Sequence, residues 1–187
     1  GSGRILAYAM NMDVRTIVLA NEDGILALMD IDLGKELASI FSEETVTSIA
    51  ISPGTGFVVV GGEFGTLTMF ESGSLNELWR TYSDSAIVAL SFSPDGRFYL
   101  SGHQDGTIQV WNAVTGALLT QMKHDGPLTS LVMSPDGNYV VSGSQDGTAR
   151  VWEIDTGLEI LRMTHDGPVN SVAFSPDGKQ VVSASED

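Results

Sequence analysis

The chain of 187 residues contains no cysteine and only nine lysine and arginine residues. The lack of cysteine excludes disulfide bonds, thiolate zinc sites and cysteine nucleophiles, and it fits a reducing compartment. Because 24 acidic residues outnumber the basic ones, the net charge of −15 repels nucleic-acid phosphates and anionic membrane surfaces. Neither a bilayer-spanning apolar run nor a signal-peptide pattern is present. We therefore expect a cytoplasmic protein that binds neither nucleic acid nor membranes, and charge favours basic partners.

One eleven-residue string recurs at a fixed spacing. It reads "SGSQDGTARVW" at residues 142–152, "SGHQDGTIQVW" at 101–111 and, in diverged form, "VGGEFGTLTMF" at 60–70. The glycines of this string, Gly24, Gly65, Gly106 and Gly147, each lie 41 residues apart. Such a period indicates a solenoid, propeller or array, in which each unit buries its apolar face against its neighbours.

Each unit is predicted to contain four short strands. Apolar residues alternate in "VNSVAF" (169–174) and "LTSLVM" (128–133), and "SPDG" at 93, 134 and 175 supplies a tight turn. Further turns at Asp-Gly and Thr-Gly pairs separate the later strands, which predicts an antiparallel meander. The segments "GKELASIF" (34–41) and "LNELWR" (75–80) are the best helical candidates, but they are in register with the fourth strand. We predict strands there.

The unit boundaries follow from this register. Residues 1–3 (Gly-Ser-Gly) look like the remnant of an expression tag, and the repeat region is expected to fill residues 4–187. The expected units are about 4–42, 43–83, 84–124 and 125–165, followed by a half unit at 166–187. In the first unit Met12 replaces the turn proline and Asp13 aligns with Asp95, so the repeat region is expected to begin on a first strand.

A period near 40 residues, four strands per unit and a tryptophan that closes the third strand together resemble the WD-repeat family of β-propellers. The Trp-Asp pair of that family is replaced here by Trp111-Asn112 and Trp152-Glu153, and its Gly-His pair by "KHDG" and "THDG". The resemblance covers residues 4–187. It implies an all-β fold, a β-propeller of four-stranded antiparallel blades, with an incomplete ring of four blades and one hairpin.

The resemblance also implies a hydrogen-bonded set of four side chains in each blade: a histidine, a serine or threonine, an aspartate and the tryptophan. The fourth unit has all four, as His124, Ser142, Asp146 and Trp152. A buried indole N–H, hydroxyl and imidazole each need a partner, so we expect the set to be satisfied as a whole. The members expected in the other units are Ser101, Asp105 and Trp111 in the third, and His165, Ser183 and Asp187 in the fifth.

The earlier units lose members of this set. Ser83 stands at the histidine position of the third unit, and the four positions of the second unit hold Ser42, Val60, Phe64 and Phe70. Polar members disappear together because a partly satisfied buried network is worse than an apolar core.

Catalytic and metal-binding interpretations are weak. A Ser-His-Asp trio suggests a hydrolase, but the trio recurs in the fifth unit and no Gly-x-Ser-x-Gly elbow accompanies it. His124 and His165 are equivalent positions of different units, which disfavours a histidine metal site. Asp30, Asp32 and Gly34 faintly resemble a calcium loop but fall in an expected turn. We expect no enzymatic activity, no metal and no cofactor.

The resemblance implies that partners dock on a rim built from the loops before the first strand and between the second and third strands. His103 is expected in such a loop, facing solvent. This acidic and locally aromatic rim suits a basic peptide by charge complementarity, although ordinary solvated turns are the alternative for any single residue. The rim residues in this sequence are Glu22, Glu63, Phe64, His103, Gln104, Asp125, Gln145 and Asp166.

These features favour a non-catalytic protein-interaction scaffold, expected to be a fragment of a longer propeller. Two alternatives stay open: a regulatory or sensor segment of a multidomain signalling enzyme, and an engineered model of blade assembly. The final hairpin would leave a bare edge at residues 181–185, and both outer blade faces would be uncovered. We therefore expect a homodimer or higher oligomer that closes the ring.

Overall fold

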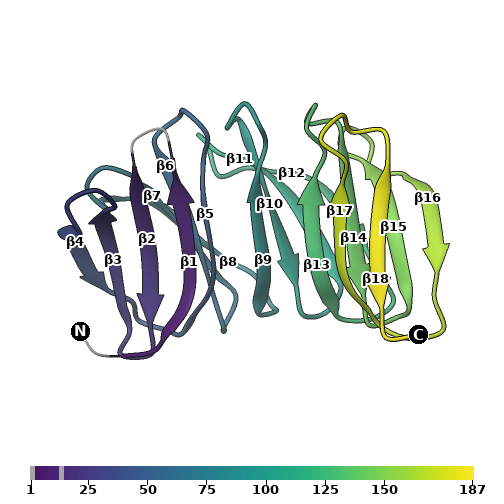
Figure 1. Ribbon diagram of the computed structural model, residues 1–187, viewed down its shortest axis with the longest axis horizontal. Helices are drawn as coiled ribbons and strands as arrows, with labels where there is room; N and C mark the ends of the chain where they lie inside the picture. Colours follow the sequence, from purple (N-terminus) through teal and green to yellow (C-terminus); the bar gives the residue numbers. More distant parts are fainter. Residues whose placement is uncertain (1–2, 13–14) are drawn as a thin grey trace.

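The computed structural model describes residues 3–12 and 15–187, so Asp13, which the repeat alignment placed in the first turn, lies outside the described residues. Within these ranges the chain forms eighteen β-strands and no helix. Accordingly, the described residues offer no helix with the length and apolarity that a membrane crossing requires. The prediction of an all-β fold is confirmed (Figure 1).

The strands form four four-stranded antiparallel sheets and one two-stranded sheet, each in sequential order. The first sheet contains β1 (Ile5–Asn11), β2 (Thr16–Asn21), β3 (Ile25–Asp30) and β4 (Lys35–Phe41), and the second contains β5 (Val46–Ile51), β6 (Phe57–Gly62), β7 (Thr66–Glu71) and β8 (Glu77–Tyr82). The third contains β9 (Ile87–Phe92), β10 (Phe98–His103), β11 (Thr107–Asn112) and β12 (Leu118–Lys123). The fourth contains β13 (Leu128–Met133), β14 (Tyr139–Ser144), β15 (Thr148–Glu153) and β16 (Glu159–Thr164), and the fifth contains β17 (Val169–Phe174) and β18 (Val181–Ser185). The two helical candidates are strands β4 and β8, as predicted.

Consecutive sheets stand side by side, from β1–β4 at one end of the molecule to β13–β18 at the other. The first sheet, β1–β4, and the last, β17–β18, lie at opposite ends of the molecule, so the sheets form an open arc, which is the predicted incomplete ring (Figure 1).

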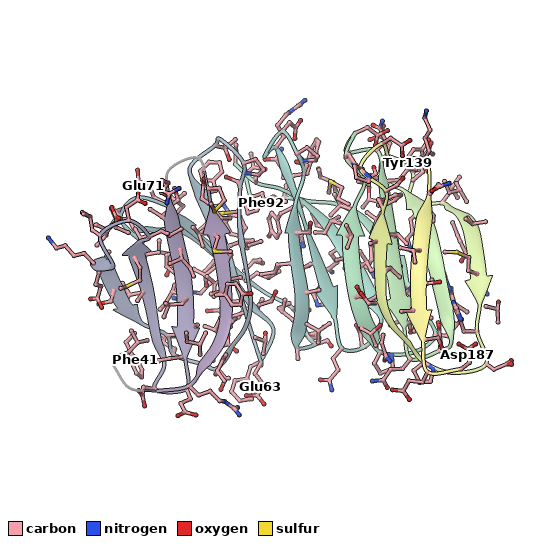
Figure 2. The ribbon with its side chains drawn as sticks, in the orientation of Figure 1. Phe41, Glu63, Glu71, Phe92, Tyr139 and Asp187 are labelled. Atoms are coloured by element: carbon pink, nitrogen blue, oxygen red, sulfur yellow. The ribbon has the colours of Figure 1, made fainter. Side chains whose placement is uncertain are left out.

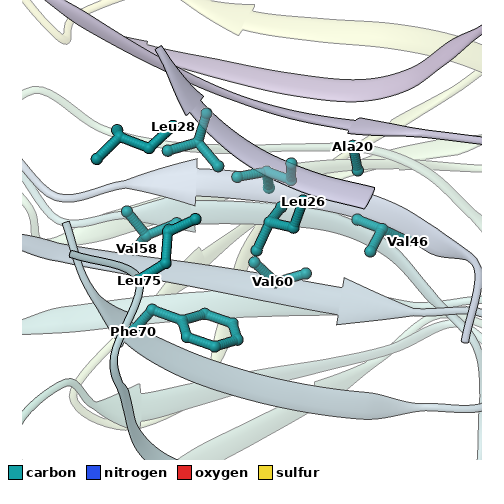
Figure 3. Close-up of a cluster of buried hydrophobic side chains, with 10 residues drawn as sticks. Ala20, Leu26, Leu28, Val46, Val58, Val60, Phe70 and Leu75 are labelled. Atoms are coloured by element: carbon teal, nitrogen blue, oxygen red, sulfur yellow. The ribbon is translucent and has the colours of Figure 1, made fainter. Parts of the chain in front are cut away.

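Alternation along each strand explains why both faces of an inner sheet are apolar. Val58 and Val60 of β6 belong to the cluster shared with the first sheet, whereas Val59 belongs to the cluster shared with the third sheet. In the first of these clusters, Leu26 lies between the two sheets and the Phe70 ring lies at the margin, next to Val60 (Figure 3). Burial of such side chains from both sides stabilises the stack by about 25 cal/mol per Å² of apolar surface.

Two irregularities recur at the same place in successive sheets. The pairing of the third strand with the fourth shifts just before Met29, Phe70, Trp111 and Trp152, which are 41 residues apart. Such a bulge bends the strand and re-aims the side chain next to it. A glycine near the end of β6, β10 and β14 lets the next sheet approach, because a Cβ on Gly102, for example, would overlap the Leu128 side chain.

Candidate functional site

The four predicted side chains of the fourth sheet form one hydrogen-bonded chain. Trp152 Nε1–H donates to Ser142 Oγ at 2.7 Å, and Ser142 Oγ lies 2.7 Å from His124 Nε2. His124 Nδ1 lies 3.1 Å from Asp146 Oδ2. If the Ser142 hydroxyl, already an acceptor, donates to Nε2, the imidazole proton is left on Nδ1, where it donates to Asp146. Each polar group of this buried set therefore has a partner.

The pKa values in this set favour a neutral histidine and an ionised aspartate. Burial lowers the pKa of His124 below its usual value, although Asp146 acts in the opposite direction. Burial alone would raise the pKa of Asp146, but hydrogen bonds from Thr148, the Asp125 backbone and His124 lower it to about 2. The Ser142 hydroxyl is fully buried, so no substrate reaches it in this conformation.

Arg150 completes the network and was missed by the sequence analysis. Its guanidinium is buried, and Nη2 lies 2.9 Å from Asp146 Oδ2 and 2.8 Å from Asp125 Oδ2. Nη1 lies 3.4 Å from Glu159 Oε2, and the guanidinium carbon lies 5.8 Å from the centre of the Trp152 ring. Three carboxylates and an aromatic face offset the desolvation of this charge. The available signal was an arginine in a third strand whose apolar neighbours indicate burial.

The expectation that His103 faces solvent is wrong. His103 ends β10 and is 1 % exposed; its Nδ1 lies 2.9 Å from Ser83 Oγ and its Nε2 lies 2.8 Å from Ser101 Oγ. Trp111 Nε1–H donates to the same Ser101 hydroxyl at 2.8 Å. With Ser83 at the usual histidine position, the imidazole enters from position 103, where the fourth unit has Ser144. Serine and histidine have exchanged places, and the buried hydroxyl and indole keep their partners.

The remaining predicted members divide into two groups. In the fifth sheet, His165 Nε2 lies 2.8 Å from Ser183 Oγ and His165 Nδ1 lies 3.3 Å from Asp187 Oδ1. In the third sheet, Asp105 instead accepts hydrogen bonds from Thr107 and from Lys123 Nζ at 3.1 Å. No hydrogen bond joins Asp105 to His103 in the described part of the chain.

The acidic turn that faintly resembles a calcium loop behaves as a turn. Leu33 N–H donates to Asp30 Oδ1 at 2.8 Å, and Asp32 pairs with Arg15 on the surface. Across residues 3–12 and 15–187 no group of three histidine, cysteine, aspartate or glutamate side chains is arranged to hold a metal ion.

All rim residues except the buried His103 are exposed. Backbone hydrogen bonds of 2.9 Å tie each rim turn to the loop before the first strand, as in Gln104 N–H to Ala86 O and Gln145 N–H to Pro127 O. Glu63 and Asp187 lie on the same edge of the arc, opposite Glu71 (Figure 2). These hydrogen bonds join each rim turn to the neighbouring loop, and the exposed carboxylates of these segments are those of Glu22, Glu63, Asp125 and Asp166.

A cavity of about 520 Å³ lies between the first and second sheets, beside the exposed rings of Phe41 and Phe64. The sequence analysis placed Phe64 on the rim but did not predict a cavity. The sequence feature that could have indicated the cavity is the loss of side-chain volume in the second unit, where serine replaces the histidine and phenylalanine replaces the tryptophan of the fourth unit.

Four-stranded antiparallel sheets that stand side by side, the third and fourth of them tied internally by a buried polar set, define a β-propeller built from repeated blades. The family model described as "WD domain, G-beta repeat" matches residues 76–112, 116–153 and 158–187, which is more than half of the chain. The chain belongs to this family of WD-repeat proteins.

One solved structure similar to this chain is that of Ika8, a computationally designed protein. The similarity has a TM-score of 0.83 and 28% sequence identity, and it covers 97% of this chain and 58% of the Ika8 chain. This chain therefore spans little more than half the length of the designed protein. A search of curated proteins finds no match.

Proposed function

We propose that this chain is a non-catalytic scaffold that holds a basic protein segment against its acidic rim. WD domains generally mediate protein–protein interactions. The observation that carries the proposal is the separation of polar groups: histidines 103 and 124 are buried inside the blades, while carboxylates line one exposed edge. Such an edge attracts basic segments and increases their rate of association. The burial of Ser142 argues against a hydrolase.

A peptide-display selection tests the proposal. A random peptide library is selected against the wild-type chain and against a variant in which four rim carboxylates are neutralised, at Glu22, Glu63, Asp125 and Asp166. We expect the wild type to enrich peptides of net positive charge, and we expect calorimetry to show at least about tenfold weaker binding to the variant. Enrichment of neutral or acidic peptides, or equal binding to both proteins, would refute the scaffold proposal.

We also propose that two copies associate and cover the outer blades, within the cytoplasm. The supporting observation is the outer face of β1, where Ile5, Tyr8 and Met10 are each more than half exposed, together with Val182 on β18. Such side chains gain about 25 cal/mol per Å² when a partner covers them. Size-exclusion chromatography with light scattering is expected to give twice the monomer mass of 19.9 kDa. A stable monomer would contradict this association.

An engineered model of blade assembly is the second candidate, and the similarity to the designed protein Ika8 favours it. A chain made only to assemble blades has no partner, so the display selection separates the two candidates: it would enrich no basic peptides.

A further inference from the structure

The cavity between the first two sheets continues onto the rim. A second hollow of about 300 Å³ lies beside Glu22 and Asp23, and it shares part of its lining with the cavity of about 520 Å³. The shared residues are Phe41, Ser42, Glu43, Glu44 and Phe64. Together the two hollows form one groove, called the interblade groove below, which runs from the apolar contact between the sheets to the acidic edge.

The interblade groove occupies the place that the polar network fills in the fourth sheet. Positions 42, 60, 64, 68 and 70 line it, and 82 residues later the same positions hold His124, Ser142, Asp146, Arg150 and Trp152. Serine in place of histidine, threonine in place of arginine and phenylalanine in place of tryptophan remove volume. The space is therefore left open where the fourth sheet places an imidazole and a guanidinium.

The carboxylates that surround Arg150 have counterparts in the groove, but the position of Arg150 itself carries no guanidinium there, and the one beside these carboxylates comes from Arg80 of β8. Glu43 corresponds to Asp125 and Glu77 corresponds to Glu159, but Thr68 stands where Arg150 would be. Arg80 offsets part of this charge: its Nη1 lies 3.0 Å from Glu43 Oε2 and its Nη2 lies 2.8 Å from Glu77 Oε2.

Glu44 adds a third carboxylate that is only half satisfied. Its Oε2 accepts the Phe64 backbone N–H at 2.6 Å. Its Oε1 is buried and has no hydrogen-bond partner among the described residues. The carboxylate occupies the space above Gly62, and the equivalent position in the third sheet carries His103. A buried carboxylate oxygen without a donor is costly, so the site favours an incoming cationic N–H group.

We infer that the interblade groove binds an arginine side chain of a partner peptide, with its guanidinium in the place that Arg150 fills in the fourth sheet. Glu44 Oε1 would accept a hydrogen bond from the guanidinium, and Phe70 would offer it a ring face, as Trp152 does for Arg150. The groove carries a net negative charge before binding, because the carboxylates of Glu43, Glu44 and Glu77 outnumber the single guanidinium of Arg80. The inference rests on the proposed scaffold function only in that a peptide supplies the arginine.

Exposed aromatic rings frame the mouth of the groove. Phe41, Phe64 and Tyr82 line it and are 74%, 76% and 70% exposed. Large apolar rings at this exposure are typical of binding surfaces, and they would cover the aliphatic stem of the arginine and its neighbours in the peptide.

The test uses NMR titration of the ¹⁵N-labelled chain with the peptide Gly-Ser-Leu-Arg-Leu-Ser-Gly and with the same peptide carrying citrulline, a neutral isostere, in place of arginine. The Phe64 amide is the reporter, because it donates to the carboxylate that would receive the guanidinium. We expect this resonance to shift on titration with the arginine peptide, and we expect the citrulline peptide to bind at least about tenfold more weakly.

Three variants locate the site. Glu44→Gln is expected to weaken binding at least about fivefold, and Thr68→Arg, which places a guanidinium of the chain itself in the groove, is expected to abolish it. If Thr68→Arg does not fold, Phe64→Ala replaces it, because an exposed side chain is removed without loss of core. The control is Glu71→Gln, which makes the same charge change at the opposite edge of the arc and should bind as wild type (Figure 2).

Three results would each overturn the proposal that the interblade groove binds arginine. They are equal binding of the two peptides, an unshifted Phe64 amide, and wild-type affinity in Glu44→Gln and Thr68→Arg. The two proposals fail separately. If the arginine peptide loses affinity only when Asp125 and Asp166 are neutralised, the proposal of arginine binding in the groove is wrong and the proposal of a scaffold with an acidic rim is supported. If the groove binds arginine but the display selection enriches no basic peptide that depends on the rim, the rim proposal is wrong instead.

Discussion

Substitution of Ser142 by alanine is expected to destabilise the fold far more than the loss of one surface hydroxyl. The Ser142 hydroxyl is fully buried and joins Trp152 Nε1 to His124 Nε2, each at 2.7 Å. Alanine is close to serine in volume, so little cavity forms, but the indole and the imidazole are both left without this partner. Each buried orphan costs about 1–3 kcal/mol, so the two together should lower the free energy of unfolding by about 2–6 kcal/mol.

Urea denaturation followed by tryptophan fluorescence measures this change as a shift in the midpoint at constant slope. The matched control is Ser171→Ala, since Ser171 is exposed on β17 and its substitution should change stability by less than about 0.5 kcal/mol. Adding Trp152→Phe to Ser142→Ala should cost less than the sum of the two single changes, because the orphaned indole is removed. A loss below about 0.5 kcal/mol for Ser142→Ala would show that the network does not stabilise the blade.

Three further changes test the buried positions. His103→Ser should lower the free energy of unfolding by about 1–3 kcal/mol, and adding Ser83→His should restore most of it by recreating the arrangement of the fourth sheet; failure of the double variant to recover in urea would contradict the exchange. Because the pKa of Asp146 is about 2 in the fold against 3.8 in the unfolded chain, its contribution of about 2 kcal/mol is present above pH 3.8 and lost as the pH falls through 2. The difference in urea midpoint between wild type and Asp146→Asn should therefore be smaller at pH 2 than at pH 5. An equal difference at the two pH values would show that ionisation of Asp146 does not stabilise the fold. Gly106→Ala should cost at least about 1–2 kcal/mol by thermal unfolding, since φ is +87° and a Cβ would overlap the neighbouring backbone, whereas Gly73→Ala, in open space, should behave as wild type.

The strands and their order follow from residue pattern alone. Period-2 apolar segments such as "VNSVAF" and turns such as "SPDG" act over a few residues, so local chemistry decides them. Strict phase between units then predicts stacking, because each sheet has two apolar faces to bury. Even β4, which looks helical in isolation, is a strand because its neighbour β3 supplies the hydrogen bonds.

The burial of His103 could not be predicted in this way. The residue pattern predicts a loop at position 103, but the His103 ring lies inside the sheet, where it forms hydrogen bonds with the hydroxyls of Ser83 and Ser101. Ser83 lies twenty residues away in sequence, and only pairing of the strands brings the two side chains together. Arg150 was missed for a related reason, since its three carboxylates come from separate segments: the loop at Asp125, the turn at Asp146 and the start of β16 at Glu159.

The period and the strand pattern were enough to predict repeated four-stranded antiparallel sheets, because these depend on contacts within one unit, and the resemblance to WD repeats supplied the place of the buried set in the fourth sheet. The interblade groove, the half-satisfied Glu44 and the exchange of Ser83 with His103 were decided by tertiary packing. They depend on the volume that one unit leaves for the next, and that volume is set by side chains from two sheets at once.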